Sequence, residues 1–198
     1  MKQAKVLTKK DINKVLTYLS VRKHSSRNRC MWMFSYLAGM RIGEISSLRL
    51  CDVLDKEGKI KNEIYLSASQ TKGIKGRTVV LSIKLRDEVD AYLKNRFKIN
   101  DLLAVTMTDT TKALFNSQKN YHRGFTASTA CQMMNSWYQE ALGEGSSHSG
   151  RRSFITNLAN KGVSVRILQE LAGHSSLSVT QRYIDVNQGL LRSSVELL

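Results

Sequence analysis

The sequence contains no proline, only three cysteines and no long hydrophobic segment. Without proline, its turns depend on Gly, Asn, Asp and Ser, the other residues that favour tight turns. Cys30, Cys51 and Cys131 are widely spaced and odd in number, which excludes a disulfide scaffold and a cysteine-based zinc cluster. A membrane span needs a run of about 18 apolar residues, and a signal peptide needs a shorter apolar core; neither occurs. We therefore expect a cytoplasmic protein without membrane contact.

Acidic residues are scarce relative to basic ones. Lys and Arg total 31 against 16 Asp and Glu, which gives a net charge of +15. A basic excess of this size favours an anionic polymer, most often nucleic acid, and a merely solvated basic surface is the alternative. Residues 1–100 carry 22 basic and 9 acidic side chains (net +13), whereas residues 101–198 carry 9 and 7 (net +2). We expect the first half to supply most phosphate contacts.

The length of 198 residues fits one domain, or at most two small ones, and the hydrophobic content of 41% is enough for a substantial core. Apolar residues recur at helical spacing through most of the chain. They predict helices near 9–20, 26–38, 41–48, 85–97, 126–142, 149–160, 164–172 and 178–184. Residues 64–66 and 78–81 are β-rich and predict a hairpin with a basic connection. The predicted fold class is mainly α with a small antiparallel β-sheet (α+β).

Several side chains suit chemistry on a phosphate. His148 and Arg151 are three residues apart, on one face of a helix start, and Tyr183 comes nine residues after His174. Taken singly, these residues are better explained as a surface pair, a helix cap and a half-buried aromatic residue. Together with Arg41 and a hairpin lysine, they suit attack on a phosphodiester by a tyrosine oxygen, because fixed cations stabilise the extra negative charge of the transition state. A lysine or histidine can protonate the leaving oxygen.

No cluster of His, Cys, Asp or Glu has the spacing of metal ligands, and no phosphate-binding P-loop motif is present. We therefore predict neither a metal ion nor a nucleotide cofactor.

Four ordered motifs resemble those of the tyrosine site-specific recombinases, or phage integrases. They are AGMRIGEISSLR (38–49), TKGIKGR (71–77), HSGRRSF (148–154), and LAGHSS followed by TQRY (171–176 and 180–183). The resemblance covers most of the chain in the family's order and separations. It implies the fold of the tyrosine recombinase catalytic domain and cleavage of DNA without a cofactor.

The resemblance implies a catalytic role for each matching residue. Arg41 and Arg151 would hold the scissile phosphate. His148 and His174 would hydrogen-bond that phosphate or help to move protons. Tyr183 would form a 3′-phosphotyrosine bond, which retains the energy of the broken phosphodiester.

Further residues of the motifs would support the reaction or bind DNA. Lys72 would be the general acid for the 5′ oxygen, with Lys75 as its rival on the same hairpin. Glu44 resembles the acidic residue that supports the first arginine of the family. Lys75, Arg77 and Arg152 are expected to contact DNA.

The sequence also departs from the family pattern. The second motif usually reads H-x-L-R-H, and here Gly150 and Arg152 replace the apolar residue and the second histidine. Family members usually begin with a separate DNA-clamping domain, whereas this chain begins almost directly with the catalytic part. We expect residues 1–198 to form a single catalytic domain without a separate N-terminal core-binding domain, as in short members such as the fimbrial-switch recombinases or in an isolated catalytic domain.

The expected function is integration, excision, inversion or resolution of duplex DNA at specific sites, which would place the protein at the nucleoid. The expected partners are double-stranded recombination sites, other copies of the chain in a tetramer on DNA, and accessory DNA-bending proteins. A catalytically silent DNA-binding regulator of the same fold is the alternative. A strand-relaxing topoisomerase or a telomere resolvase shares the chemistry, but the extra domains of those enzymes are missing here.

The tail has apolar residues at helical spacing, namely Leu190, Leu191, Val195 and Leu198. The resemblance implies that residues 187–198 form an exchange helix that passes to a neighbouring subunit on DNA. We expect the free protein, without DNA, to be a monomer. Packing of this face on its own domain is the alternative.

Overall fold

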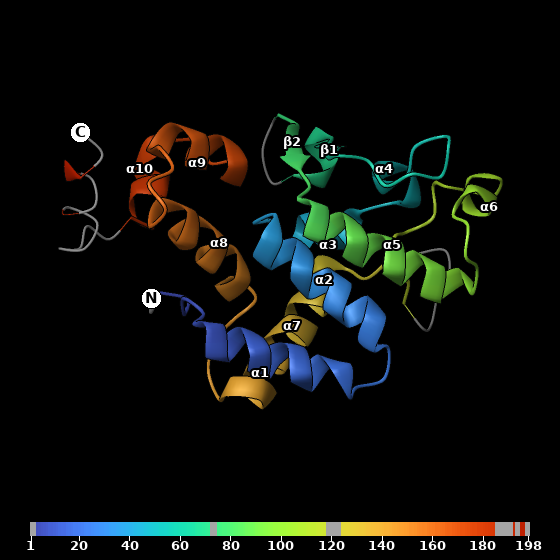
Figure 1. The fold of residues 1–198 in the computed structure, drawn as a ribbon, viewed down its shortest axis with the longest axis horizontal. Coiled ribbons are helices and arrows are strands. Elements are labelled where there is room, and N and C mark those ends of the chain that lie inside the picture. Colours follow the sequence, from blue (N-terminus) through green and yellow to red (C-terminus); the bar gives the residue numbers. More distant parts are fainter. Residues whose placement is uncertain (1–2, 72–74, 118–123, 185–191, 193–194, 197–198) are drawn as a thin grey trace.

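The computed structural model describes residues 3–71, 75–117, 124–184, 192 and 195–196, and Figure 1 shows that it is mainly helical. The helices are α1 (Lys9–Ser20), α2 (Ser25–Leu37), α3 (Ile42–Ser47), α4 (Leu50–Val53), α5 (Ile83–Phe97), α6 (Leu103–Thr106), α7 (Ala127–Leu142), α8 (Ser149–Ala159), α9 (Val165–Ala172) and α10 (Leu177–Gln181), with a 3-10 turn η1 (Ala68–Gln70). The strands β1 (Glu63–Leu66) and β2 (Arg77–Val80) pair antiparallel, with Ile64 opposite Val79. The predicted fold class is confirmed.

The longer helices follow local signals in the sequence. At the start of α1, the Thr8 hydroxyl accepts a hydrogen bond from the Asp11 backbone N–H at 3.2 Å, and the Asp11 carboxylate accepts one from the Thr8 backbone N–H at 3.0 Å. This reciprocal cap fixes the predicted start. The sequence does not predict α4 and α6, because four residues are too few for helical periodicity to show. The helix predicted over 178–184 is α10, which begins at Leu177 and ends at Gln181, three residues early.

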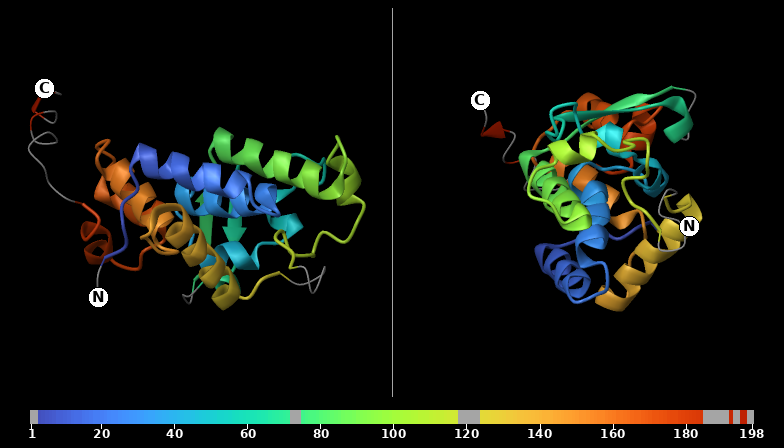
Figure 2. Two further views of the ribbon diagram at one scale, coloured as in Figure 1. Left: turned by 90° about the horizontal axis from the view of Figure 1, so that it is seen from below. Right: turned by 90° about the vertical axis from the view of Figure 1, so that its right-hand side faces the viewer.

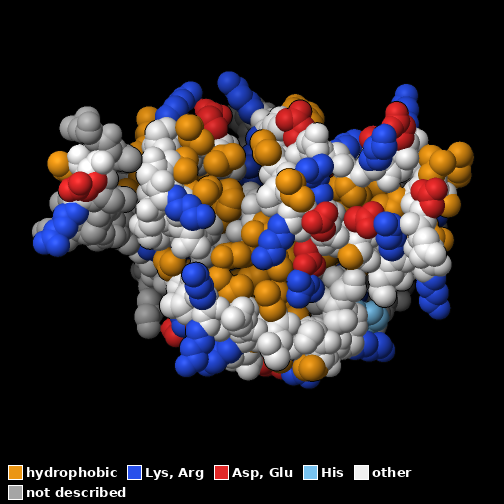
Figure 3. Space-filling view, viewed as in Figure 1, with side chains coloured by type: hydrophobic (Ala, Val, Ile, Leu, Met, Phe, Trp, Pro, Cys, Tyr) orange, Lys and Arg blue, Asp and Glu red, His pale blue; other side chains and the backbone are white. Residues whose placement is uncertain are grey.

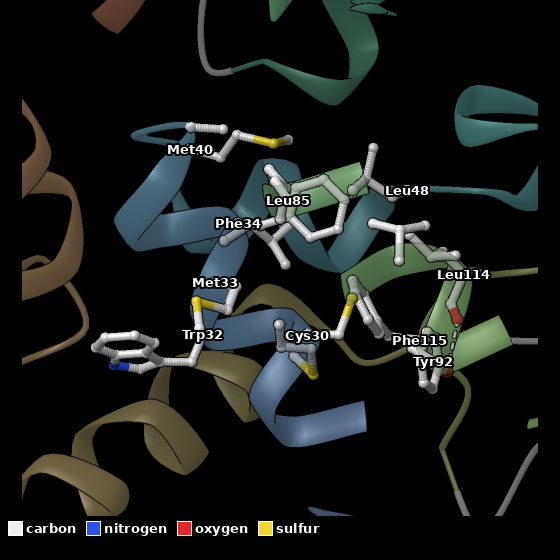
Figure 4. Close-up of a cluster of buried hydrophobic side chains, with 14 of the residues drawn as sticks. Cys30, Trp32, Met33, Phe34, Met40, Leu48, Leu85, Tyr92, Leu114 and Phe115 are labelled. Atoms are coloured by element: carbon white, nitrogen blue, oxygen red, sulfur yellow. Dashed lines mark hydrogen bonds between the residues drawn. The ribbon is translucent and has the colours of Figure 1, made fainter. Parts of the chain in front are cut away.

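The helices enclose a core that extends along α2. This helix packs against α5 on one side and against α8 on the other, while α1 packs against α7. In the core, Phe115 meets Phe34 edge-on at 5.9 Å between ring centroids and stacks on Tyr92 at 5.4 Å (Figure 4). Buried aromatic pairs of this kind contribute large apolar areas to stability. The core therefore holds α2 rigidly, and α3 with the first motif follows directly from it.

The break between α2 and α3 positions the first motif. Gly39 has a φ of +60°, and a Cβ added there would overlap the ring of Phe154 in α8. Glycine alone adopts this backbone conformation without strain, so the chain can turn sharply out of α2 and lie close against α8. Figure 2 shows α8, α9 and α10, coloured orange to red, gathered at one end of the molecule. The first and the last motifs meet at that end.

Candidate active site

Three arginines from separate parts of the chain donate hydrogen bonds to the end of α9. The consecutive carbonyls of residues 171–173 each accept a hydrogen bond from a different guanidinium. In order, the donors are Arg77 Nη1 (3.1 Å), Arg151 Nη2 (2.6 Å) and Arg41 Nη2 (3.0 Å). The final carbonyls of a helix have no partner within the helix, and cations are favoured at that end of the helix dipole. The end of α9 therefore brings together three motifs that are distant in sequence.

Glu44, which is only 1% exposed, joins two of these arginines. Its carboxylate accepts hydrogen bonds from the backbone N–H (2.8 Å) and Nη1 (3.0 Å) of Arg41, and from Nε (3.1 Å) and Nη2 (2.7 Å) of Arg77. Burial by itself would raise the pKa of the Glu44 carboxyl, but the hydrogen bonds and charges of Arg77 and Arg41 lower this pKa below its ordinary value. Glu44 is therefore ionised at neutral pH and fixes both guanidinium groups.

Arg151 lies in the first turn of α8 and is only 4% exposed. Its Nη1 donates to the carbonyl of Gly39, which links the second motif to the break after α2. Burial, followed by repulsion from Arg41, lowers the pKa of Arg151 to about 9, so the side chain is still cationic at neutral pH. A guanidinium has five N–H donors, and the bonds to the carbonyls of Gly39 and Ala172 leave others that can face a phosphate oxygen.

His174 and Tyr183 stack on each other with 5.4 Å between ring centroids and 22° between ring planes. His174 Nδ1 lies 2.9 Å from the hydroxyl of Thr180. Burial, followed by the positive charges of the nearby arginines, lowers the pKa of His174 to about 4. The imidazole is therefore uncharged at neutral pH, and each of its nitrogens can act as either a donor or an acceptor according to the tautomer.

Helix α8 holds Tyr183 from a second direction. The guanidinium carbon of Arg152 lies 5.5 Å from the centroid of the Tyr183 ring, within the range of a cation–π contact. The Thr156 hydroxyl donates to the Tyr183 carbonyl at 3.3 Å. Arg152, which the sequence assigns to DNA contact, thus lies against the tyrosine. Its contact with DNA stays a prediction, as does the catalytic use of the tyrosine.

Four of the six residues predicted to be catalytic come together at the end of α9: Arg41, Arg151, His174 and Tyr183. His148 is exposed and immediately precedes α8, within one helical turn of Arg151. Sequence reasoning missed Thr180, whose contact with His174 depends on how α10 turns back after α9. The sequence offered one nearby signal, the TQRY motif (180–183), in which Thr180 is the first residue.

The hairpin between β1 and β2 differs in part from expectation. Lys72, the predicted general acid, lies outside the described residues. Lys75 is exposed, and its carbonyl accepts a hydrogen bond from the Thr71 hydroxyl at 3.0 Å. Arg77 is predicted to contact DNA, but its side chain is only 10% exposed and points inward to Glu44. The sequence groups Arg77 with the basic hairpin connection because nothing local shows that the buried carboxylate lies opposite it.

Two general properties of the described residues bear on the site. Among them, no group of three or more His, Cys, Asp or Glu side chains is placed to hold a metal ion. Within the same part of the chain, no helix combines the length and apolar character needed to cross a membrane.

Known proteins share both the sequence pattern and the fold. The tyrosine recombinase XerA of Pyrococcus furiosus is 28% identical over 193 residues, which are 97% of this chain and 61% of the relative, so this chain spans less than two thirds of that protein. A crystal structure of XerA recombinase superposes with a TM-score of 0.73 at 23% identity, over 100% of this chain and 66% of that one. The XerH site-specific recombinase bound to difH substrate superposes with a TM-score of 0.70 at 22% identity, over 98% of this chain and 54% of that one. The sequence profile of the phage integrase family matches residues 5–189, and the chain therefore belongs to that family.

Proposed function

We propose that residues 1–198 form the catalytic domain of a site-specific DNA recombinase, which cleaves and rejoins duplex DNA through a 3′-phosphotyrosine intermediate. The convergence of Arg41, Arg151, His174 and Tyr183 at the end of α9 carries the proposal, because these are the cations, the neutral imidazole and the nucleophile that the reaction needs. Duplex DNA as the substrate is supported by the similarity to XerH, which was solved on a difH substrate.

In the proposed reaction, the oxygen of Tyr183 attacks the scissile phosphorus and the 5′ oxygen leaves. Arg41 and Arg151 stabilise the negative charge that develops on the nonbridging oxygens. When the Thr180 hydroxyl donates to Nδ1 of His174, the Nε2–H of this neutral imidazole is free to donate to a phosphate oxygen.

Proton transfer completes both halves of the cycle. The tyrosine proton passes to a nearby base, and Lys72 protonates the leaving 5′ oxygen. His148 is one candidate for this base, and His174 is the other in its second tautomer, in which Nδ1 donates to Thr180 and Nε2 can accept a proton. In the second half, a 5′ hydroxyl loses its proton and attacks the phosphotyrosine, the bond between phosphorus and the Tyr183 oxygen breaks, and the tyrosine regains a proton as the phosphodiester is restored. Because one phosphate ester replaces another in each step, no nucleotide cofactor is consumed.

The test is a covalent trapping experiment. A recombination site is first selected from random duplexes by binding. It is then supplied with a nick just beyond the cleavage point, so that the short fragment with the new 5′ hydroxyl diffuses away and cannot reverse the reaction. The proposal predicts a covalent protein–DNA adduct on a denaturing gel. Tight, sequence-specific binding without any adduct would instead identify the chain as a silent DNA-binding regulator.

We expect Lys72→Ala to cleave a normal phosphodiester very slowly and a 5′-bridging phosphorothiolate at a near-normal rate, because sulfur leaves without a proton. Arg151→Ala should stay defective on both substrates, since it acts on the nonbridging oxygens. Initial rates of adduct formation on the two substrates provide the measurement. Rescue of Lys75→Ala, and not of Lys72→Ala, would transfer the role of general acid to Lys75.

We expect DNA binding to weaken steeply as salt rises, with most of the effect coming from residues 1–100. Each neutralised phosphate contributes a slope of about −0.9 in log K against log salt, and this half carries the net charge of +13. Figure 3 shows one face on which Lys and Arg alternate with Asp and Glu, so exposed residues of each half should be tested singly. The substitution Lys75→Glu should reduce the slope of log K against log salt more than Lys161→Glu does. Equal effects of the two substitutions would contradict the expectation.

We further propose that the complex on DNA is a tetramer in which residues 187–198 pass to a neighbouring subunit, and that accessory DNA-bending proteins help to bring two sites together at the nucleoid. Val195 is 69% exposed, which leaves its side chain available to a neighbour. Leu190, Leu191 and Leu198 lie outside the described residues.

A further inference from the structure

Arg77 is the one arginine at the end of α9 that has no role in the proposed reaction. It lies at the start of β2, and its guanidinium spans two elements. Nε and Nη2 bind the two carboxylate oxygens of Glu44 at 3.1 and 2.7 Å, while Nη1 donates to the carbonyl of Leu171 at 3.1 Å. A planar guanidinium can make this forked contact with a carboxylate and a third bond at the same time, whereas a lysine ammonium has no such fork.

The aliphatic part of Arg77 packs against the turn that leads to His174. Gly173 has a φ of +60°, and a Cβ added there would overlap Cδ of Arg77. The carbonyl of the same glycine accepts the hydrogen bond from Arg41. The position of Arg77 therefore bears on the backbone that carries His174 and on one of the contacts that orient Arg41.

Charge balance gives Arg77 a second influence on Arg41. Two guanidinium groups share the single carboxylate of Glu44. The Arg77 guanidinium donates to both oxygens, whereas the Arg41 guanidinium donates to Oε1 and the Arg41 backbone N–H donates to Oε2. Without Arg77, the buried carboxylate would have only Arg41 as a cationic partner in this network. We expect the side chain of Arg41 to be drawn toward Glu44 and away from the position in which it can meet a phosphate.

We propose that Arg77 is a positioning residue for DNA cleavage, which holds Glu44 and the last turn of α9 where Arg41, Arg151 and His174 can meet the scissile phosphate. The inference rests on the proposed function. Arg77 also lies in the hairpin that carries Lys72, so the same contacts anchor the base of that hairpin to α3 and α9. Its basic side chain therefore acts inside the protein and not on the surface that contacts DNA.

The first test compares Arg77→Gln and Arg77→Lys with Lys84→Ala. Lys84 is an exposed residue of the neighbouring helix α5, and its replacement removes one positive charge, as Arg77→Gln does. We expect Arg77→Gln to slow adduct formation about 10²-fold, the cost of a small misplacement of reacting groups, while its DNA affinity falls no more than that of the control. Arg77→Lys keeps the charge and the aliphatic stem, and it should remain folded but slow. Wild-type rates in both Arg77 variants, or a loss of DNA affinity as large as the loss of rate, would overturn the proposal.

The second test does not depend on activity. Two-dimensional ¹H–¹⁵N spectra of the arginine Nε groups report the surroundings of each guanidinium, and the Arg41 and Arg151 signals can be assigned by replacing those residues. Arg77→Lys should shift both signals, whereas Lys84→Ala should leave them in place. Unshifted signals in a folded Arg77→Lys variant would overturn the positioning role. Absence of an adduct from the wild-type chain would instead reject the proposed function.

Discussion

Replacing Tyr183 by Phe is expected to abolish the covalent DNA adduct while DNA binding is retained. The substitution removes only the hydroxyl oxygen, which is the atom that would bond to phosphorus. The ring can still stack on His174 and lie under Arg152, because both contacts use the ring and not the oxygen. The fold around the site should therefore persist. The measurement is the trapped adduct on a nicked duplex, with DNA affinity determined in parallel.

Tyr65→Phe is the matched control, because Tyr65 is an exposed tyrosine on β1. Two other tyrosines, Tyr92 and Tyr138, are buried in the core. The Tyr92 hydroxyl donates to the carbonyl of Leu114 at 2.8 Å, and the Tyr138 hydroxyl accepts a hydrogen bond from Trp32 Nε1 at 2.9 Å. Burial raises the pKa of both phenols well above the ordinary value, which makes them poor nucleophiles.

A Tyr183→Phe protein that still forms the adduct would show that another tyrosine attacks the phosphate. The candidates would then be the half-buried Tyr18 and Tyr36 and the exposed Tyr65, together with Tyr121, which lies outside the described residues. Peptide mapping of the adduct would identify the modified residue directly.

Replacing Arg151 by Ala should slow cleavage by about 10²–10³-fold, the usual cost of losing a donor to the transition state. A loss of stability should accompany the slower reaction. Arg151 donates to the buried carbonyls of Gly39 and Ala172, and a buried acceptor left without its partner costs about 1–3 kcal/mol. Rates of adduct formation and thermal melting curves together measure both effects.

Arg151→Lys separates the two effects. A lysine keeps the positive charge and can reach one carbonyl, so we expect part of the stability to return. It lacks the guanidinium fork, so the cleavage rate should remain low. Arg166→Ala is the control, since Arg166 is an exposed residue of α9 whose ion pair with Glu170 is on the surface. Near-normal cleavage in Arg151→Ala, together with a much lower melting temperature, would make Arg151 a purely structural residue.

Local signals in the sequence were sufficient to predict most of the helices. The reciprocal cap of Thr8 and Asp11 acts within one turn, and apolar periodicity extends over several turns in α5 and α7, so neighbouring residues define these elements. The short helices α4 and α6 depend on contacts with the rest of the chain, because four residues do not hold a helix by themselves.

The sequence by itself also determined which residues are proposed to carry the chemistry, since the motifs contain the arginines, the histidines and the tyrosine in fixed order. Only the tertiary structure decided what each of them touches. The free carbonyls at the end of α9 attract guanidinium groups from any part of the chain that folds against them, and no local pattern records that contact. For the same reason, Arg77 reads as a DNA contact in the sequence, whereas in the fold a buried carboxylate 33 residues earlier draws its side chain inward.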